Sequence, residues 1–166
     1  MPSVLLIHLR WSVADADASP LNEEMLSRLR SYLPRYAETL SARCLMVGGV
    51  HDHLHLLLDL PVTRSLQEVE DELRRASQRF LRDVLGSSLF LWSGGEGNYR
   101  SVSPQEQEEV VNYIRLQAER HAAEDLWDAL EAGSAATQAP LANEPSPAPD
   151  EKLPEWLRSA MSGQKN

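Results

Sequence analysis

The sequence predicts one α/β or α+β domain followed by a tail, and three observations lead to this fold class. The chain has 166 residues, which is enough for one compact core and too few for two ordinary domains. Short apolar segments alternate with amphipathic segments up to about residue 132. Beyond it the composition turns to Ala, Pro, Ser and Asn, which cannot bury enough apolar surface to fold. We therefore expect a domain over 1–132 and a disordered Pro/Ala-rich tail over 133–166.

Strand-like and helical patterns alternate in the first half of the chain. Three segments rich in β-branched and apolar residues predict strands: 4–11, 43–50 and 53–60. The last two are separated only by a short polar break, which favours a neighbouring antiparallel pair. Apolar residues recur at helical spacing over 21–40, where Pro34 predicts a kink or a break.

The second half contains two predicted helices. Ser65 begins the capping-box pattern SLQE, so a helix is expected over 65–85. Its expected apolar face comprises Leu66, Val69, Leu73, Ala76, Phe80 and Val84. Glycines and aromatics over 89–102 then indicate a short strand, a loop and another short strand. A long helix follows, capped by Ser103 and continuing to about Ala132.

The overall charge limits the function classes that the chain suits. Its 25 acidic and 16 basic residues give a formal net charge of -9, whereas DNA-binding proteins usually carry a basic surplus. Any nucleic-acid binding must therefore come from local basic faces. No apolar run reaches about 18 residues and no signal-peptide pattern is visible, so we expect a cytoplasmic protein with no membrane partner. The single cysteine, Cys44, is expected to be a buried, reduced thiol.

His53 and His55 stand two residues apart in a predicted strand. Because successive strand side chains point to opposite faces, both imidazoles leave the same face, which suits a metal ion. His51 and His53 have the same spacing, but His51 falls in the expected turn, and Leu54 and Leu56 can bury opposite the other pair. Histidines in an apolar strand are also common as core residues, so spacing alone leaves both roles open.

Tyr113 and Gln117 lie four residues apart in the last predicted helix, so they stack on one face of it. A phenol and an amide oxygen can then approach the same point. The alternative is that the tyrosine packs in the core and the glutamine faces water, which are ordinary roles for both residue types. Only their combination with the histidine pair favours a shared site.

Several of these segments resemble one family. VHDHLHLLL at 50–58 resembles the Asp-His-x-His-hydrophobic signature of the single-tyrosine HUH transposases, the insertion-sequence 200/605 type and its REP-associated relatives. LWSGGEGNYRSVS at 91–103 is similar to their Trp-x-x-Gly and Ser-Val-Ser loop, and YIRLQAERH at 113–121 to their tyrosine helix. IHLRWS at 7–12 is similar to their first strand, so the resemblance runs in the family's order over roughly residues 4–122.

This resemblance implies a ferredoxin-like antiparallel sheet with helices packed on it, the histidine motif on a central strand and the tyrosine on a C-terminal helix. It also implies that His53 and His55 bind Mg²⁺ or Mn²⁺ with Gln117 as a third protein ligand. Tyr113 would attack the scissile phosphate of single-stranded DNA, leaving a 5′-phosphotyrosine and a free 3′-hydroxyl. Family members are typically homodimers that act on hairpin-bearing ends. His121 matches one histidine of the family's helix and is expected at most to assist.

A basic face on the helix expected over 65–85 would compensate for the acidic total. The candidate DNA-binding residues are Arg74, Arg75, Arg79, Arg82 and Arg100. The same arginines could instead form a solvated face paired with neighbouring acids. Asp15 and Asp17 follow the first strand, where the family usually has basic residues, and would repel phosphate.

Two function classes fit these residues. The first is an active metal-dependent transposase that cleaves single-stranded DNA and transfers the strand. The second is a domesticated DNA-binding protein that keeps the fold and no longer mobilises DNA. Retention of the four candidate site residues favours the first class, and the acidic total favours the second. A metal hydrolase acting on another substrate would need further ligands, which the sequence does not place.

Overall fold

The computed structural model describes residues 3–94 and 98–131, and the tail predicted over 133–166 lies outside these residues. The main elements follow the order β1 (Leu6–Ser12), α1 (Glu23–Thr39), β2 (Arg43–Gly49), β3 (His53–Asp59), α2 (Leu66–Asp83) and β4 (Asn98–Val102). The strands form one antiparallel sheet in the order β2-β3-β1-β4. This βαββαβ order confirms the ferredoxin-like fold that the resemblance implied. The histidine motif therefore lies on an inner strand.

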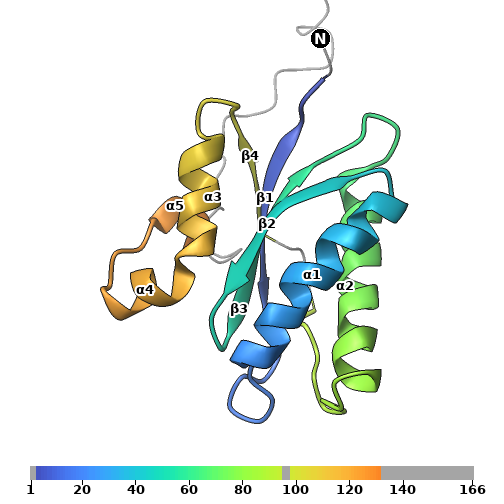
Figure 1. Ribbon diagram of the computed structural model, residues 1–166, viewed down its shortest axis with the longest axis vertical. Coiled ribbons are helices and arrows are strands. Elements are labelled where there is room, and N and C mark those ends of the chain that lie inside the picture. The colour runs from blue at the N-terminus through green and yellow to red at the C-terminus, as the bar shows by residue number, and fades with distance from the viewer. Residues whose placement is uncertain (1–2, 95–97, 132–166) are drawn as a thin grey trace, which may run out of the picture. The chain divides into compact units, whose positions relative to one another are not determined.

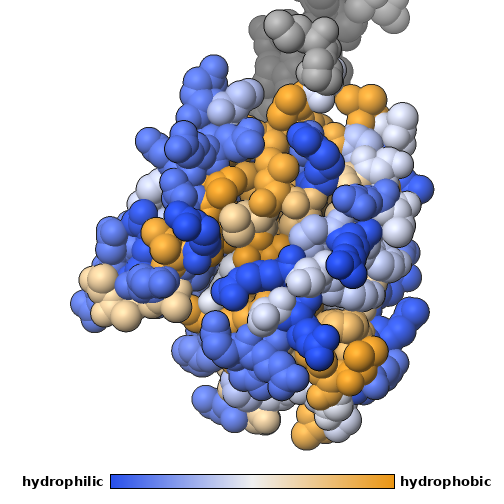
Figure 2. Space-filling view, in the orientation of Figure 1, coloured by the Kyte–Doolittle hydropathy of each residue, from blue (hydrophilic) through white to orange (hydrophobic). Residues whose placement is uncertain are grey.

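The two faces of the sheet are covered by different helices (Figure 1). One face packs against α1 and α2, and its core includes Leu9, Trp11 and Leu56. The other face is covered by α3 (Gln107–Arg115), α4 (Gln117–Ala122) and α5 (Asp128–Glu131). A second, smaller core lies there, with Leu6 and Leu57 among its members. Figure 2 shows apolar side chains gathered in the middle of the viewed surface, between the helices of the two faces.

Local signals predicted the two long helices well. The Ser65–Glu68 capping box is present at the start of α2, and Asn22 caps α1 through the backbone N–H of Met25. The predicted break at Pro34 is wrong, because α1 runs through it without interruption and buries Leu33 before it and Ala37 after it. Val84 is also wrong as a core residue, since it is 68% exposed and Leu81 is buried instead.

The long helix predicted from Ser103 to Ala132 is wrong, because the chain forms three short helices there. The side chain of Ser103 contacts that of Glu106, and α3 begins only at Gln107. Leu116, with φ -101 and ψ 26, interrupts the helix between α3 and α4. The first short strand predicted in 89–102 is reduced to an isolated bridge between Trp92 and Val13.

Close contact between α3 and the sheet depends on a glycine. A Cβ atom at Gly48 would lie 2.0 Å from the backbone oxygen of Ile114 on α3. Gly48 pairs across the strands with His55. Glycine therefore lets the helix that carries Tyr113 approach β2, the strand next to the one that carries the histidines. No helix in the described residues is long and apolar enough to cross a membrane.

Candidate active site on the α3 face

The two histidines of the predicted motif occupy the first and third positions of β3. Both side chains leave the face covered by α3, and both residues are buried, with exposures of 1% for His53 and 0% for His55. Their ring centroids are 4.9 Å apart. Strand alternation thus brings the imidazoles together as the sequence predicted.

Each imidazole has a partner at Nδ1. Asp52 Oδ1 lies 2.7 Å from His53 Nδ1, and His8 Nε2 lies 2.8 Å from His55 Nδ1. Such outer partners orient histidines that use Nε2 as a ligand. The sequence reasoning missed His8. A signal was present, because His8 and Arg10 are two residues apart in the same strand and their side chains therefore leave the same face of the sheet.

Burial also sets the protonation of the histidine pair formed by His8 and His55. It lowers the pKa of His55 to about 4 and the pKa of His8 to about 3. Both rings are therefore neutral near neutral pH. A neutral imidazole is the form that donates a lone pair to a metal ion.

Tyr113 and Gln117 join the histidines from α3 and α4. The amide oxygen of Gln117 lies 3.3 Å from His53 Nε2, and the ring of Tyr113 stands edge-on to that of His55 with centroids 5.9 Å apart. Tyr113 is fully buried and Gln117 is 1% exposed. The structure thus brings together all four residues that the sequence singled out, although the two helical residues belong to separate helices.

Glu131, which the sequence reasoning missed, lies at the centre of this group. Its Oε1 accepts a hydrogen bond of 2.5 Å from the Tyr113 hydroxyl and lies 3.1 Å from His55 Nε2. Its Oε2 lies 3.2 Å from His53 Nε2. His53, His55 and Glu131 form a cluster whose ligand atoms all lie within 4.8 Å of one another, which could hold a metal ion. No local sequence pattern marks Glu131, because it meets the histidines only through the fold.

An arginine and a histidine lie close to the Glu131 carboxylate. Arg10 Nε and His121 Nε2 each lie 3.6 Å from one of its oxygens. Burial opposes ionisation of Glu131, but hydrogen bonds from His53 and His55 outweigh it and hold the pKa of this carboxyl well below its ordinary range. The side chains from β1, β3 and α3 that meet here therefore stabilise an anionic oxygen.

The phenol of Tyr113 is covered by the segment that follows α4. The Trp127 ring stacks on it with centroids 4.8 Å apart, and the Trp127 backbone N–H donates to its hydroxyl. The Arg120 guanidinium lies 5.1 Å from the centroid of the Tyr113 ring. Burial raises the pKa of Tyr113 to about 12, and the Glu131 carboxylate acts in the same direction. The hydroxyl is therefore protonated at neutral pH.

The predicted DNA-binding arginines divide into two groups. Arg100 lies on β4 opposite His8, on the histidine side of the sheet, and pairs with Glu106 at 3.3 Å. The others lie on α2, which covers the opposite face: Arg74, Arg75, Arg79 and Arg82. Arg74 contacts the backbone oxygen of Ser93, and the remaining three line a shallow hollow on the outer side of α2. The α2 arginines are thus separated from the catalytic candidates by the sheet.

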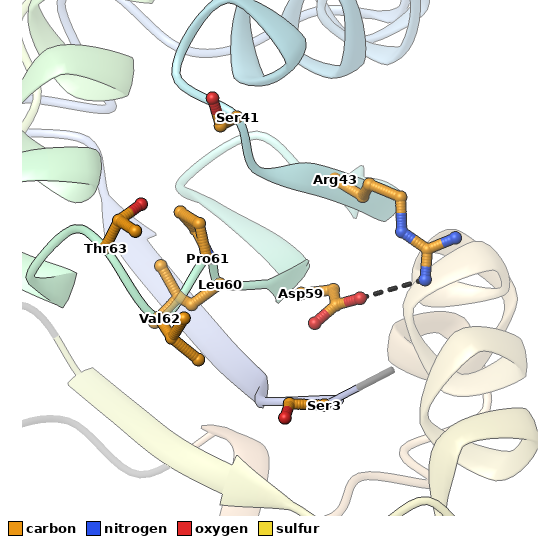
Figure 3. A pocket seen from close by; sticks show the side chains of 8 residues that line it. All are labelled: Ser3, Ser41, Arg43, Asp59, Leu60, Pro61, Val62 and Thr63. Atoms are coloured by element: carbon orange, nitrogen blue, oxygen red, sulfur yellow. Dashed lines mark hydrogen bonds and ion pairs between the residues drawn. The ribbon is translucent and has the colours of Figure 1, made fainter. Parts of the chain in front are cut away.

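A second hollow lies at the other end of β3 (Figure 3). Its lining includes Asp59, the last residue of the strand that begins with His53. The Arg43 guanidinium in this hollow is paired with Asp59 at 2.9 Å. The hollow is therefore remote from the histidine cluster, and the charges of Arg43 and Asp59 in it neutralise each other.

Comparisons with known proteins give one matching family model and several structures of similar fold. A family model described as IS200-like transposase matches residues 3–117. A crystal structure of a candidate transposase from Deinococcus radiodurans is 20% identical, covers 70% of this chain and 93% of that chain, and has a TM-score of 0.53. The structure of a REP-associated tyrosine transposase bound to a REP hairpin is 12% identical, covers 77% of this chain and 85% of that chain, and has a TM-score of 0.53. No curated protein matches the chain.

Proposed function

The chain belongs to the IS200-like transposase family and is a transposase, and we propose that it cleaves and rejoins single-stranded DNA through a covalent bond to Tyr113. The observation that supports this proposal most strongly is the approach of Tyr113 to the histidine pair. One carboxylate oxygen of Glu131 contacts both the Tyr113 hydroxyl, at 2.5 Å, and His55 Nε2, at 3.1 Å. A phosphate group held by the same partners would lie beside the nucleophile.

We propose that a divalent cation, Mg²⁺ or Mn²⁺, binds between His53, His55 and Gln117. The donor set fits, because the Gln117 amide oxygen lies 3.3 Å from His53 Nε2, the two histidine rings have centroids 4.9 Å apart, and each imidazole is oriented through Nδ1. His53 Nε2 lies beside oxygen atoms of both Glu131 and Gln117. A cation bound between these three atoms would contact all of them. When bound, it would withdraw charge from the phosphate that is cleaved.

The protein groups then carry out the transfer. The Tyr113 oxygen attacks the phosphorus, the O–P bond to the phenol forms, and the bond from phosphorus to the 3′ oxygen breaks. The phenolic proton leaves as the 3′-hydroxyl gains one, so the products are a 5′-phosphotyrosine and a free 3′ end. Arg10 and His121 lie near the Glu131 carboxylate, and a phosphate bound there would have its charge offset by the Arg10 guanidinium. Because the phosphodiester energy is kept, rejoining needs no nucleotide cofactor.

The DNA itself would be single-stranded and would carry a hairpin; the REP-associated tyrosine transposase of similar fold is bound to a REP hairpin. We propose that Arg100 contacts the strand near the site, and that the arginines of α2 bind phosphates away from it. The exposed Asp15 and Asp17 follow β1 at the histidine end of the sheet and would weaken this binding. Assembly as a homodimer remains a prediction of the family resemblance, and a cytoplasmic location remains a prediction of the sequence pattern.

An adduct experiment tests the proposed function. The full chain is incubated with Mn²⁺ and labelled single-stranded hairpin DNAs, and a denaturant-resistant adduct should map by mass spectrometry to the peptide that contains Tyr113. His53→Ala and chelation should each remove the adduct, whereas His51→Ala, an exposed residue in the preceding turn, should retain it. DNA binding without an adduct would contradict the proposal and favour the domesticated binding protein.

His8 is expected to control the metal affinity of His55. Since His55 must present the Nε2 lone pair, the proton shared with His8 belongs on His55 Nδ1, and His8 accepts it. His8→Leu removes the acceptor and should weaken Mn²⁺ binding about 10- to 100-fold by titration calorimetry. His8→Gln can place an amide oxygen at the position of Nε2 and should restore most of the affinity. Equal affinities for the leucine variant and the parent would show that the contact is only packing.

A further inference from the structure

The helix that ends the described residues places a carboxylate in the candidate metal site. Glu131 lies 14 residues beyond the segment that the family model matches, which ends at residue 117. Its side chain is only 13% exposed and faces His53, His55 and Tyr113. Nothing in the family resemblance assigns a role to this residue.

The position of Glu131 is held by buried neighbours. Leu130 is 1% exposed and packs in the small core with Leu57 and Tyr113. Trp127 stacks on Tyr113, and its backbone oxygen accepts hydrogen bonds from the backbone N–H groups of both Leu130 and Glu131. The carboxylate is therefore fixed by the packing of α5 and is not a loose side chain that happens to reach the histidines.

The distances around Glu131 match those between neighbouring ligands of one cation. Ligand atoms about 2.1 Å from an octahedral Mg²⁺ or Mn²⁺ ion lie about 3.0 Å apart when they occupy adjacent positions. The Glu131 oxygens lie 3.1 Å from His55 Nε2 and 3.2 Å from His53 Nε2, and the Gln117 oxygen lies 3.3 Å from His53 Nε2. Small shifts would thus bring all four side chains into one coordination shell. An octahedral ion would still have positions for a phosphate oxygen and water.

We propose that Glu131 is a fourth protein ligand of the divalent cation and that it also holds the Tyr113 hydroxyl beside that cation. This inference rests on the proposed metal site of His53 and His55. Glu131 supplies the negative charge in a donor set whose other members are two neutral imidazoles and an amide. One of its oxygens contacts Tyr113 and His55 and the other contacts His53, so one side chain couples the nucleophile to the metal site. The short helix α5 therefore completes the catalytic site.

Metal binding without DNA tests this role directly. Mn²⁺ affinity of the full chain is measured by calorimetry and by electron paramagnetic resonance. Glu131→Gln keeps the size of the side chain and removes its charge, and we expect it to weaken Mn²⁺ binding at least tenfold, since even outer-shell changes cost about 10- to 100-fold. Glu131→Ala should weaken it further. Asp128→Asn, an exposed acid on the same helix, is the matched control and should bind as the parent does.

The outcomes separate this inference from the proposed function. A parent chain that fails to bind Mn²⁺, or one whose affinity is unchanged in His53→Ala, overturns the metal site itself. Binding that is lost in His53→Ala but unchanged in both Glu131 variants overturns only the role of Glu131. Unchanged metal affinity together with a faster Tyr113–DNA adduct would likewise overturn it, because the carboxylate would then merely occupy the place of the phosphate. Thermal unfolding of each variant confirms that the affinities compare folded proteins.

Discussion

Tyr113→Phe should reduce covalent DNA adduct formation by about a thousandfold or more, as expected when a nucleophile is removed. The phenol is fully buried beside the histidine pair, and its hydroxyl donates to Glu131 at 2.5 Å. Phenylalanine keeps the ring and its stacking on Trp127 but removes the attacking oxygen. The adduct is measured in single-turnover reactions with Mn²⁺ and hairpin DNA. Mn²⁺ affinity should change little, because the phenol is not among the proposed ligands.

The structure also gives the expected stability of Tyr113→Phe and a control variant for it. The hydroxyl donates to Glu131 and accepts from the Trp127 backbone N–H, so its loss should cost about 1 to 2 kcal/mol of unfolding free energy. Tyr99→Phe is the matched control, because Tyr99 is 62% exposed on β4, and it should retain full adduct formation. An adduct that persists in Tyr113→Phe and disappears in Tyr99→Phe would place the nucleophile on β4.

Gly48→Ala should lower both the stability and the rate of adduct formation. The added Cβ would lie 2.0 Å from the backbone oxygen of Ile114, and a backbone atom cannot rotate away as a side chain can. Overpacking of this kind costs about 3 kcal/mol of unfolding free energy. Ile114 follows Tyr113 in α3, so relief of the clash moves the nucleophile away from His55. A displacement of about 1 Å can slow a reaction about 100-fold.

Two measurements check the effect of Gly48→Ala. Chemical denaturation reports the free energy of unfolding, and the adduct rate below the denaturation range reports the position of the nucleophile. Gly94→Ala is the control, because a Cβ there meets no atom within 4 Å. If Gly48→Ala unfolds and reacts like the parent, the close approach of α3 to β2 does not exist in solution.

The formal charge of -9 describes the chain as a whole, whereas the site has its own electrostatics. The fold brings Arg10 of β1 to 3.6 Å from one oxygen of Glu131 and His121 of α4 to 3.6 Å from the other. These interactions act over a few ångströms among largely buried side chains, where solvent screens them little. A net acidic composition therefore does not exclude a site that holds a phosphate.

Local sequence patterns predicted the elements that depend on neighbouring residues. Alternation along β3 placed His53 and His55 on one face, and the Ser65–Glu68 pattern marked the start of α2. The family resemblance added Tyr113 and Gln117, and the structure brings both to the histidines. These predictions succeeded because strand alternation and helix capping are determined within a few residues of chain.

Tertiary contacts decided the rest of the site. The helix predicted from Ser103 to Ala132 is divided at Leu116, and the chain then turns back so that Trp127 covers Tyr113 and Glu131 reaches β3. His8 acquires its role only because β1 pairs with β3. In each case the partners are at least 14 residues apart, and Glu131 and His55 are 76 apart. No local pattern encodes such a meeting, because it results from how the helices pack on the sheet.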